Sequence, residues 1–237
     1  MPMLPKIVPP SDCSLCQHRF PGMFCDFSPK NLADFNTVGR LFSFPAGAIL
    51  MREEDPANQV FVICRGQVKL SCVSKEGRTL NLKIAVSGEV LGLSAVISGS
   101  PFEVTAETMA PTDVSLIPRD DFLAFIRSHG EASLHAAHSL AAEYKSALSG
   151  ARSLALSGSV AGRVARLLLD WGNAASSDRH ETWFNMDLTH EDLADFAGAT
   201  RETITRTLGR FQKDKLIQIR GVTVHILLPE KLADLAA

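Results

Sequence analysis

The clearest structural signal in the chain is Thr189-His-Glu-Asp-Leu-Ala-Asp-Phe-Ala-Gly-Ala-Thr-Arg-Glu-Thr-Ile-Thr-Arg-Thr-Leu-Gly-Arg-Phe-Gln212. Thr189 is a suitable N-cap for a first helix, because acidic residues follow it in the first turn. Gly198 lies where the chain must turn sharply, often with a positive φ. Thr200 can cap a second helix. The segment therefore predicts two short helices joined by a tight turn.

The second of these helices has two different sides. At 100° per residue, Ile204, Leu208 and Phe211 fall in one narrow arc, which predicts the buried stripe. Arginine can bind a guanine edge through two hydrogen bonds, glutamate can accept from a cytosine amino group, and threonine offers a hydroxyl and a methyl. We therefore predict that the outward side binds DNA through Thr200, Arg201, Glu202, Thr205, Arg206 and Arg210. The alternative is an ordinary solvated helix pair that carries a few arginines.

The charge around this helix favours the DNA-binding interpretation. Residues 199–221 contain six Lys or Arg and two acids, whereas residues 181–195 contain five acids and no Lys or Arg. A basic face beside an acidic one suits a protein that orients on a polyanion. The next segment, 216–227, alternates around Arg220-Gly221 and predicts a hairpin with a glycine turn. Two helices followed by a hairpin predict a winged helix-turn-helix.

Length and composition limit the remaining possibilities. The chain has 237 residues, 46% of them hydrophobic, and a formal net charge of −2. Two domains are expected at this length, and any basic surface must be local. No run of eighteen apolar residues exists, and the N-terminus lacks the apolar core of a signal peptide. We therefore expect a cytoplasmic protein without a membrane partner, whose five cysteines are thiols or metal ligands and not disulfides.

The middle of the chain predicts a sheet structure. From about residue 38 to 118, short apolar runs are interrupted by glycines, four of them eleven residues apart at 66, 77, 88 and 99. Evenly spaced short strands with turn signals predict a sandwich, barrel or roll. Residues 131–156 predict a long alanine-rich helix, which either covers the roll or pairs with its copy in a two-fold dimer. The seam for such a pair would run through Leu134, Ala137 or His138, Ala141, Tyr144 and Leu148.

These observations predict an α+β chain in four parts. They are an N-terminal cysteine-bearing segment (1–30), a β-roll sensor (31–118), linking and dimerisation helices (119–156) and a winged helix-turn-helix (157–237).

This organisation resembles the Crp/Fnr family of bacterial transcription regulators over about residues 32–235. The most specific matches are Gly198-Ala-Thr-Arg-Glu-Thr-Ile-Thr-Arg206, Leu208-Gly-Arg-Phe-Gln212, Phe61-Val-Ile-Cys-Arg-Gly66 and Gly88-Glu-Val-Leu-Gly92. The resemblance implies a double-stranded β-roll like that of cyclic-nucleotide-binding domains, a homodimer formed through the long helix, and an inverted-repeat operator in double-stranded DNA. It also implies RNA polymerase as a partner. The Glu-Thr-Ile-Thr-Arg run is closest to the Fnr branch, whereas Arg201 is more similar to the Crp branch.

The roll lacks the residue that cyclic-nucleotide members use for the phosphate. Those members carry a Pro-Arg-Ser-Ala type cassette, whose arginine pairs with the cyclic phosphate. Here the corresponding segment is Ser98-Gly-Ser-Pro-Phe-Glu-Val104, in which no arginine occurs and Glu103 adds negative charge. We therefore predict no tight binding of cyclic AMP or cyclic GMP.

Three cysteines precede the roll in the spacing C-x2-C-x8-C: Cys13, Cys16 and Cys25. Clustered thiolates in a reducing compartment suit an iron–sulfur cluster or zinc. Fnr-type oxygen sensors carry a similar trio and a fourth cysteine late in the roll, where this chain has Val114. The trio therefore predicts a [4Fe–4S] cluster, with structural zinc or a metal-free vestige as alternatives. Cys64 is the first choice for a fourth ligand, and the others are Cys72, His18 and Asp26, although a single strand cysteine is usually a small buried hydrophobe.

Together the patterns favour a transcription regulator that senses oxygen, nitric oxide or redox state. The alternatives are a regulator of the same fold whose roll binds a small effector, and a protein of this shape that does not bind DNA. An enzyme is not expected, because nucleophile-elbow, P-loop and zinc-protease motifs are all absent. The histidines predict no metal site: His135 and His138 are expected to be exposed or in the dimer seam, and His190 to lie in a capping turn.

Overall fold

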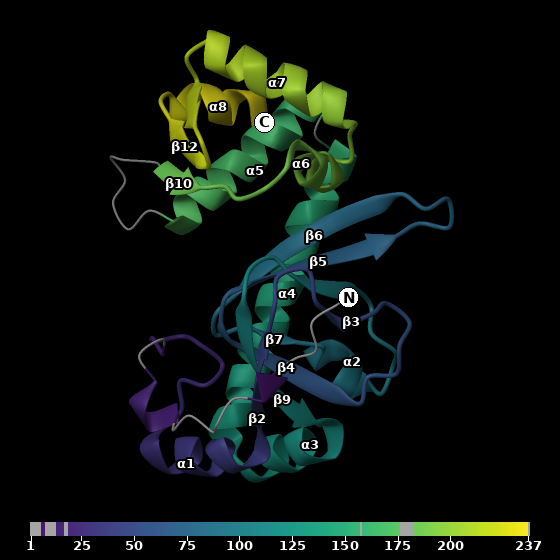
Figure 1. Ribbon diagram of the computed structural model, residues 1–237, viewed down its shortest axis with the longest axis vertical. Coiled ribbons are helices and arrows are strands. Elements are labelled where there is room, and N and C mark those ends of the chain that lie inside the picture. The colour runs from purple at the N-terminus through teal and green to yellow at the C-terminus, as the bar shows by residue number, and fades with distance from the viewer. Residues whose placement is uncertain (1–5, 8–12, 17–18, 157, 176–182, 237) are drawn as a thin grey trace. The chain divides into compact units, whose positions relative to one another are not determined.

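The computed structural model describes residues 6–7, 13–16, 19–156, 158–175 and 183–236 (Figure 1). The chain divides into two compact units, one of Met1–Arg78 with Leu82–Ser146 and one of Thr79–Asn81 with Ala147–Ala237. The α+β architecture of roll, long helix and C-terminal helix-turn-helix that the sequence predicts is confirmed. Among the described residues, no helix has the length and apolar character needed to span a bilayer.

The first unit is built from two sheets and the helices that surround them. One sheet has the strand order β1-β2-β9-β4-β7 and the other the order β3-β8-β5-β6. The strands are β1 (Lys6–Ile7), β2 (Arg40–Phe44), β3 (Ile49–Met51), β4 (Gln59–Arg65), β5 (Gln67–Val73), β6 (Thr79–Val86), β7 (Val90–Leu91), β8 (Thr105–Thr108) and β9 (Thr112–Pro118). The helices are η1 (Cys13–Leu15), α1 (Pro29–Val38), α2 (Leu93–Ser98), α3 (Arg119–Ser128) and α4 (Gly130–Leu156). The last part of α4, from Ala147 on, and the first three residues of β6 belong to the second unit.

The strands of the roll bury apolar side chains in one core, and in β4 the four consecutive residues from Val60 to Ile63 are all buried. Val60, Ile63 and Ile117 are fully buried in the core between the sheets. The four glycines spaced by eleven all have positive φ and end strands or helix α2. Gly88 shows why this residue type is needed, because a Cβ atom there would lie 2.5 Å from the Met23 side chain. The glycine spacing in the sequence therefore corresponds to the turns of the roll.

Two parts of this unit are not expected from the sequence. Strand β1 pairs with β2, with Lys6 opposite Ser43 and Ile7 opposite Phe42. Helix α1 begins at Pro29, a residue type that favours the first helical turn, and buries Leu32 and Phe35. The segment before the roll is therefore partly structured and contributes to the core.

The second unit is a helical bundle with a small sheet. Its helices are α5 (Val160–Ala175), α6 (His190–Ala197), α7 (Arg201–Lys213) and α8 (Pro229–Ala236), and its strands are β10 (Trp183–Asn185), β11 (Ile217–Arg220) and β12 (Thr223–Ile226). Strands β11 and β12 form the predicted hairpin, with Arg220 opposite Thr223 and Gly221 at φ +58°. Strand β10 was not predicted, and it pairs with β12 with Trp183 opposite His225. Leu168, Leu193 and Ile204 lie in the core that these elements enclose.

Candidate nucleic-acid interface and cysteine site

Local capping fixes the geometry of the two-helix segment. Thr189 accepts a hydrogen bond from the Asp192 backbone N–H, and the Asp192 side chain accepts from the Thr189 N–H, so that both groups form a capping box. Gly198 ends α6 with φ +57°. Thr200 then caps α7 by accepting from the Thr203 N–H. The N-cap and turn residues predicted from the sequence therefore act as expected.

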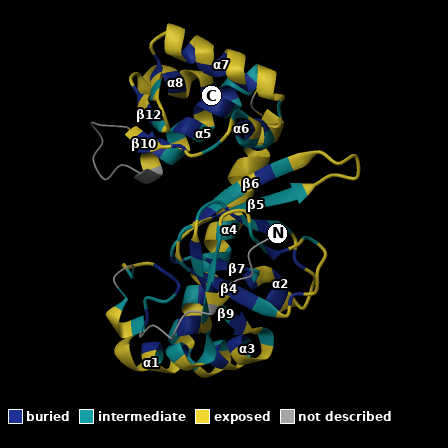
Figure 2. Ribbon diagram, viewed as in Figure 1, coloured by how far each residue is buried: buried dark blue, intermediate teal, exposed yellow. Residues whose placement is uncertain are grey.

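Helix α7 has one buried side and one exposed side, which is visible as alternating colours in Figure 2. Ile204, Leu208 and Phe211 are buried against the rest of the unit. The residues predicted to contact DNA are all exposed: Thr200, Arg201, Glu202, Thr205, Arg206 and Arg210. Burial of Glu202 and Arg206 would have excluded a DNA-reading role, and the structure shows the opposite. This side of α7 can therefore approach the base edges of a major groove.

The carboxylate of Glu202 on α7 is held in its ionised form. The pKa of Glu202 lies below its usual value, because the carboxylate accepts hydrogen bonds at the start of the helix from its own backbone and from Thr200. The neighbouring cations Arg201 and Arg206 lower it further. An ionised Glu202 can accept a hydrogen bond from a cytosine amino group. Arg210 forms a 3.5 Å ion pair with Asp214 one turn later, at the exposed end of the helix.

One residue next to this surface was not recognised from the sequence. His190, the first residue of α6, places its Nδ1 atom 2.9 Å from the Thr205 hydroxyl oxygen on α7. The sequence analysis assigned His190 only to the capping turn. The position of His190 directly after the N-cap indicates that its side chain points out of the first turn of α6. It does not indicate that this side chain meets Thr205.

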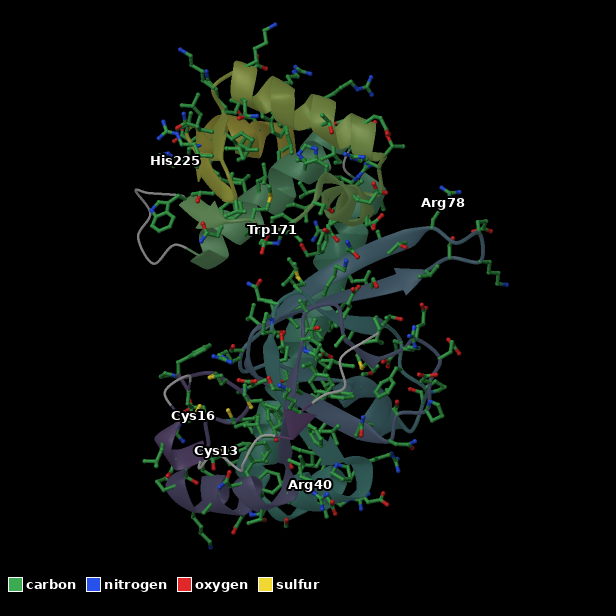
Figure 3. All side chains as sticks on the ribbon, viewed as in Figure 1. Cys13, Cys16, Arg40, Arg78, Trp171 and His225 are labelled. Carbon is green, nitrogen blue, oxygen red and sulfur yellow. The ribbon has the colours of Figure 1, made fainter. Side chains whose placement is uncertain are left out.

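The wing presents further polar side chains beside the helices. Val224 and Ile226 of β12 are buried, whereas His225 between them is exposed (Figure 3). Arg220 lies at the exposed hairpin turn. This alternation fits a wing that contacts a DNA backbone with its outer side.

The cysteine trio lies in the N-terminal segment of the first unit. Cys13 is the first residue of the short helix η1 and Cys16 directly follows it (Figure 3), and the Cys16 N–H donates to the Cys13 carbonyl oxygen. Burial raises the pKa of the Cys25 thiol to about 11, and electrostatic interaction with Cys13 and Cys16 adds to the rise. None of the five cysteines forms a disulfide.

The two cysteines of the roll differ in their surroundings. Burial raises the pKa of Cys64 to about 12, and Cys25, Cys13 and Cys16 contribute to that rise. Burial also raises the pKa of Cys72, but its charged neighbour is Glu53. Cys64, on β4, therefore interacts electrostatically with the three cysteines of the trio. Cys72 interacts instead with the carboxylate of Glu53.

The remaining ligand candidates are less well placed. Asp26 uses a carboxylate oxygen to accept from the Gly22 N–H at 3.1 Å, and His18 lies outside the described residues. Val114, at the position of the missing cysteine, is fully buried in the roll core. Among the residues that the structure describes, no group of three or more His, Cys, Asp or Glu is arranged to hold a metal ion. Cys64 interacts electrostatically with Cys25, Cys13 and Cys16, and thiolate sulfur is a donor that both iron–sulfur clusters and zinc accept.

The segment that follows the cysteine trio contacts the first two turns of α4 through hydrogen bonds and ring stacking. The His135 Nδ1 atom lies 2.9 Å from the Phe24 carbonyl oxygen, and its ring stacks on Phe27 at 5.1 Å. Glu131 accepts hydrogen bonds from Ser28 and from Asn31. The expectation that His135 would be exposed is therefore wrong, because packing against Phe27 half-buries it, whereas its place in a dimer seam stays a prediction. His138 is exposed.

The same corner of the first unit contains a cleft of about 450 Å³. It lies between the Gly22–Phe24 segment, the turn from β6 to β7, and α4. Its charged and polar lining residues are Lys83, Glu89, His135, His138, Ser139 and Glu143. Burial raises the pKa of Glu143 to about 7, and Glu89 and Glu103 add to the rise while Lys83 opposes it.

The segment that would hold a cyclic phosphate contains an aromatic ring. Phe102 is buried, and a Cβ atom at Gly92 would lie 2.6 Å from its ring. The ring therefore covers the backbone at the Gly92 turn.

Two protein-family models match the chain. Residues 41–129 match a cyclic nucleotide-binding domain, and residues 162–235 match a Crp-like helix-turn-helix domain. The first covers the roll with α3, and the second covers most of the C-terminal unit.

Characterised relatives are similar over nearly the whole length. The CRP-like cAMP-activated global transcriptional regulator of Mycobacterium tuberculosis is 26% identical over 90% of this chain and 95% of its own. The nitrogen fixation regulation protein FixK of Bradyrhizobium diazoefficiens is 25% identical over 95% and 94%. The solved structure of FixK2 from Bradyrhizobium japonicum has a TM-score of 0.75 at 22% identity, covering 84% of this chain and 98% of that one.

Proposed function

The chain belongs to the Crp/Fnr family of DNA-binding transcription regulators, and from that premise we propose that it acts as a homodimer on an inverted-repeat operator. The observation that carries this proposal is the exposed side of α7, with Arg201, Glu202, Thr205 and Arg206 opposite a buried apolar stripe. Two such helices related by a two-fold axis would enter major grooves about one helical turn, or ~34 Å, apart.

The uncovered apolar side chains of α4 support the dimer. Leu134, Tyr144 and Leu148 are 55%, 68% and 47% exposed in the single chain. They belong to the seam predicted from the sequence, and contiguous exposed apolar side chains on one helix commonly mark an interface. We expect a dimer in light scattering even without a bound signal, and a monomer would contradict the proposal.

Replacement of one base-reading arginine tests DNA binding. Arg206→Ala removes a side chain able to bind guanine through two hydrogen bonds, a contact worth about 1–3 kcal/mol for each half-site. The expected loss of operator affinity is therefore roughly tenfold or more, measured by fluorescence anisotropy on an operator selected from random duplexes. Arg127→Ala, at an exposed position of α3, is the matched control and should bind like the wild type. Equal affinity of all three proteins would refute the role given to α7.

A regulator of this kind requires RNA polymerase as its functional partner. We propose that the DNA-bound dimer changes the rate at which the polymerase initiates at a promoter with the selected operator. Run-off transcription with and without the protein tests this directly, and no change in either direction would contradict it.

For the signal, we propose that Cys13, Cys16, Cys25 and Cys64 hold a [4Fe–4S] cluster of the Fnr type. The C-x2-C-x8-C spacing of the trio and the electrostatic interaction of Cys64 with Cys13, Cys16 and Cys25 support this assignment. When bound, such a cluster would supply an oxygen- and nitric-oxide-sensitive redox centre. The polypeptide would position it beside α4, because Phe24 next to Cys25 is bonded to His135.

Metal analysis of the anaerobically purified protein tests the cluster. We expect a broad visible absorption with matching iron and acid-labile sulfide, lost in Cys25→Ser. Cys72→Ser is the control, since the charged neighbour of Cys72 is Glu53, and this variant should retain the spectrum. Zinc in place of iron and sulfide would support a structural metal, and a metal-free anaerobic protein would contradict both.

A second candidate signal is a small effector in the 450 Å³ cleft beside α4. A cyclic nucleotide is not the expected effector, because Phe102 covers the Gly92 turn and the 98–104 segment has no arginine. Calorimetry with cyclic AMP and cyclic GMP on the metal-free protein should show no tight binding. Micromolar affinity for either nucleotide would overturn this expectation.

A further inference from the structure

The hydroxyl group of Thr205 is already engaged inside the C-terminal unit. Its oxygen lies 2.9 Å from His190 Nδ1 and donates to the Arg201 carbonyl oxygen at 3.0 Å. The Arg201 carbonyl belongs to the preceding turn of α7, and His190 belongs to α6. Both partners are held by well-capped helices, since α6 begins with the Thr189 capping box and α7 with the Thr200 cap.

A hydroxyl has a single proton to donate, and that proton is committed within the protein. If it is directed to the Arg201 carbonyl, the His190 Nδ1–H donates to the oxygen, and if it is directed to His190, the ring nitrogen accepts it. In both arrangements Thr205 cannot donate to thymine O4, to adenine N7 or to guanine O6 and N7, which are the acceptors of the major groove. The remaining substituent of its Cβ atom is the methyl group, on a side chain that is exposed.

We infer that Thr205 reads a thymine through methyl–methyl contact, and that His190 is the positioning residue that turns its hydroxyl away from the DNA. An apolar contact with the C5 methyl of thymine requires no donor or acceptor from the protein. Each half-site should therefore contain one thymine whose methyl, and not its O4 atom, is recognised. This specificity rests on the proposed function, because it applies only when α7 lies in a major groove.

Uracil substitution in a selected operator isolates that methyl group. Duplexes selected by the full-length wild-type protein are resynthesised with deoxyuridine in place of each thymine in turn. At one position per half-site, affinity should fall about fourfold, the value of one buried methyl-sized group. Uracil retains O4, so a contact made by the hydroxyl would leave the affinity unchanged.

Two variants of Thr205 separate the methyl from the hydroxyl. Thr205→Val keeps a methyl and should bind the thymine operator within about twofold of the wild type, with the same loss on uracil. Thr205→Ser keeps only the hydroxyl in both subunits, so it should bind the thymine operator about sixteenfold more weakly, about fourfold for each half-site, and be insensitive to uracil at that position.

Variants of His190 test its positioning role through base preference and not through affinity alone. A fresh selection with His190→Ala should relax the thymine preference at that position, because the released hydroxyl can turn toward a base. His190→Asn restores an N–H donor near the Nδ1 position and should restore the preference. A purely structural role would change affinity without changing which base is selected.

The outcomes distinguish this inference from the proposed function. If the wild-type protein selects no sequence, DNA reading by α7 itself fails. If it selects an operator in which no thymine is sensitive to uracil, or if Thr205→Ser binds like the wild type while Thr205→Val does not, only the methyl-reading inference fails.

Discussion

Replacing Glu143 by glutamine should make the protein more stable at neutral and alkaline pH. Burial raises the pKa of this carboxyl from 4.5 to about 7, Lys83 opposes the rise, and the like charges of Glu89 and Glu103 add to it. The unfolded chain releases this proton near pH 4.5, whereas the folded protein keeps it until about pH 7. Stability therefore falls as the pH rises between these values, and the full penalty is present above pH 7.

The size of the penalty follows from the same values. A rise from 4.5 to about 7 corresponds to at most about 3 kcal/mol. Because the side chain is only partly buried, solvent screening reduces this to about 1–2 kcal/mol. The Glu143→Gln variant has no charge to bury, so it should gain this amount at pH 8 and nothing at pH 4.

Urea unfolding of both proteins between pH 4 and 8 measures this difference. Glu131→Gln is a useful contrast, since hydrogen bonds from Ser28 and Asn31 lower the pKa of Glu131, and its replacement should destabilise the protein at neutral pH. A carbon-13 titration of glutamate carboxyl groups should show one inflection near pH 7 that is lost in Glu143→Gln. A gain that is the same at pH 4 and pH 8, or a loss at pH 8, would refute the reasoning.

Three further predictions concern the turns and helix ends. Thr189→Ala removes the capping box of α6 and should cost about 1 kcal/mol in thermal unfolding of the C-terminal unit; an unchanged melting temperature would contradict the role of the cap. Gly92→Ala places a Cβ atom 2.6 Å from the Phe102 ring, so it should destabilise the roll by more than Gly77→Ala, where φ is similar but no atom lies within 4 Å. Comparable melting temperatures for these two variants would argue against the clash. Arg210→Ala breaks only an exposed ion pair and should change stability by less than about 0.5 kcal/mol. If Arg210 contacts a phosphate, the slope of log affinity against log salt concentration should decrease in magnitude by about one in this variant.

Features encoded by neighbouring residues were predictable from the sequence. The caps at Thr189 and Thr200, the turn at Gly198 and the buried stripe through Ile204 depend on spacings of a few residues, which propensity and periodicity reveal. The glycine spacing of the roll was informative for the same reason.

Features that depend on distant contacts were not predictable in this way. Phe24 meets Phe122, and Phe27 meets Phe125 and His135, about a hundred positions later, and no local pattern reports such pairings. The contact between His190 and Thr205 crosses a turn, and spacing alone does not show which side chains meet there. Strand pattern likewise could not separate Cys64 from Cys72, because both are small residues on neighbouring strands with different electrostatic surroundings.

The aromatic cluster also determines how far the polypeptide can be trimmed. Phe24 and Phe27 pack edge-on against Phe35 at 6.0 and 5.2 Å, and Phe27 also packs against Phe125 at 5.7 Å. A fragment that starts at α1 would lose both rings and would expose the apolar surfaces of Phe35 and Phe125 that they cover. Exposed apolar surface of this kind promotes aggregation. Truncated variants should therefore retain residues 19–30, because Phe24 and Phe27 in this stretch cover the core of the first unit whether or not Cys25 is replaced.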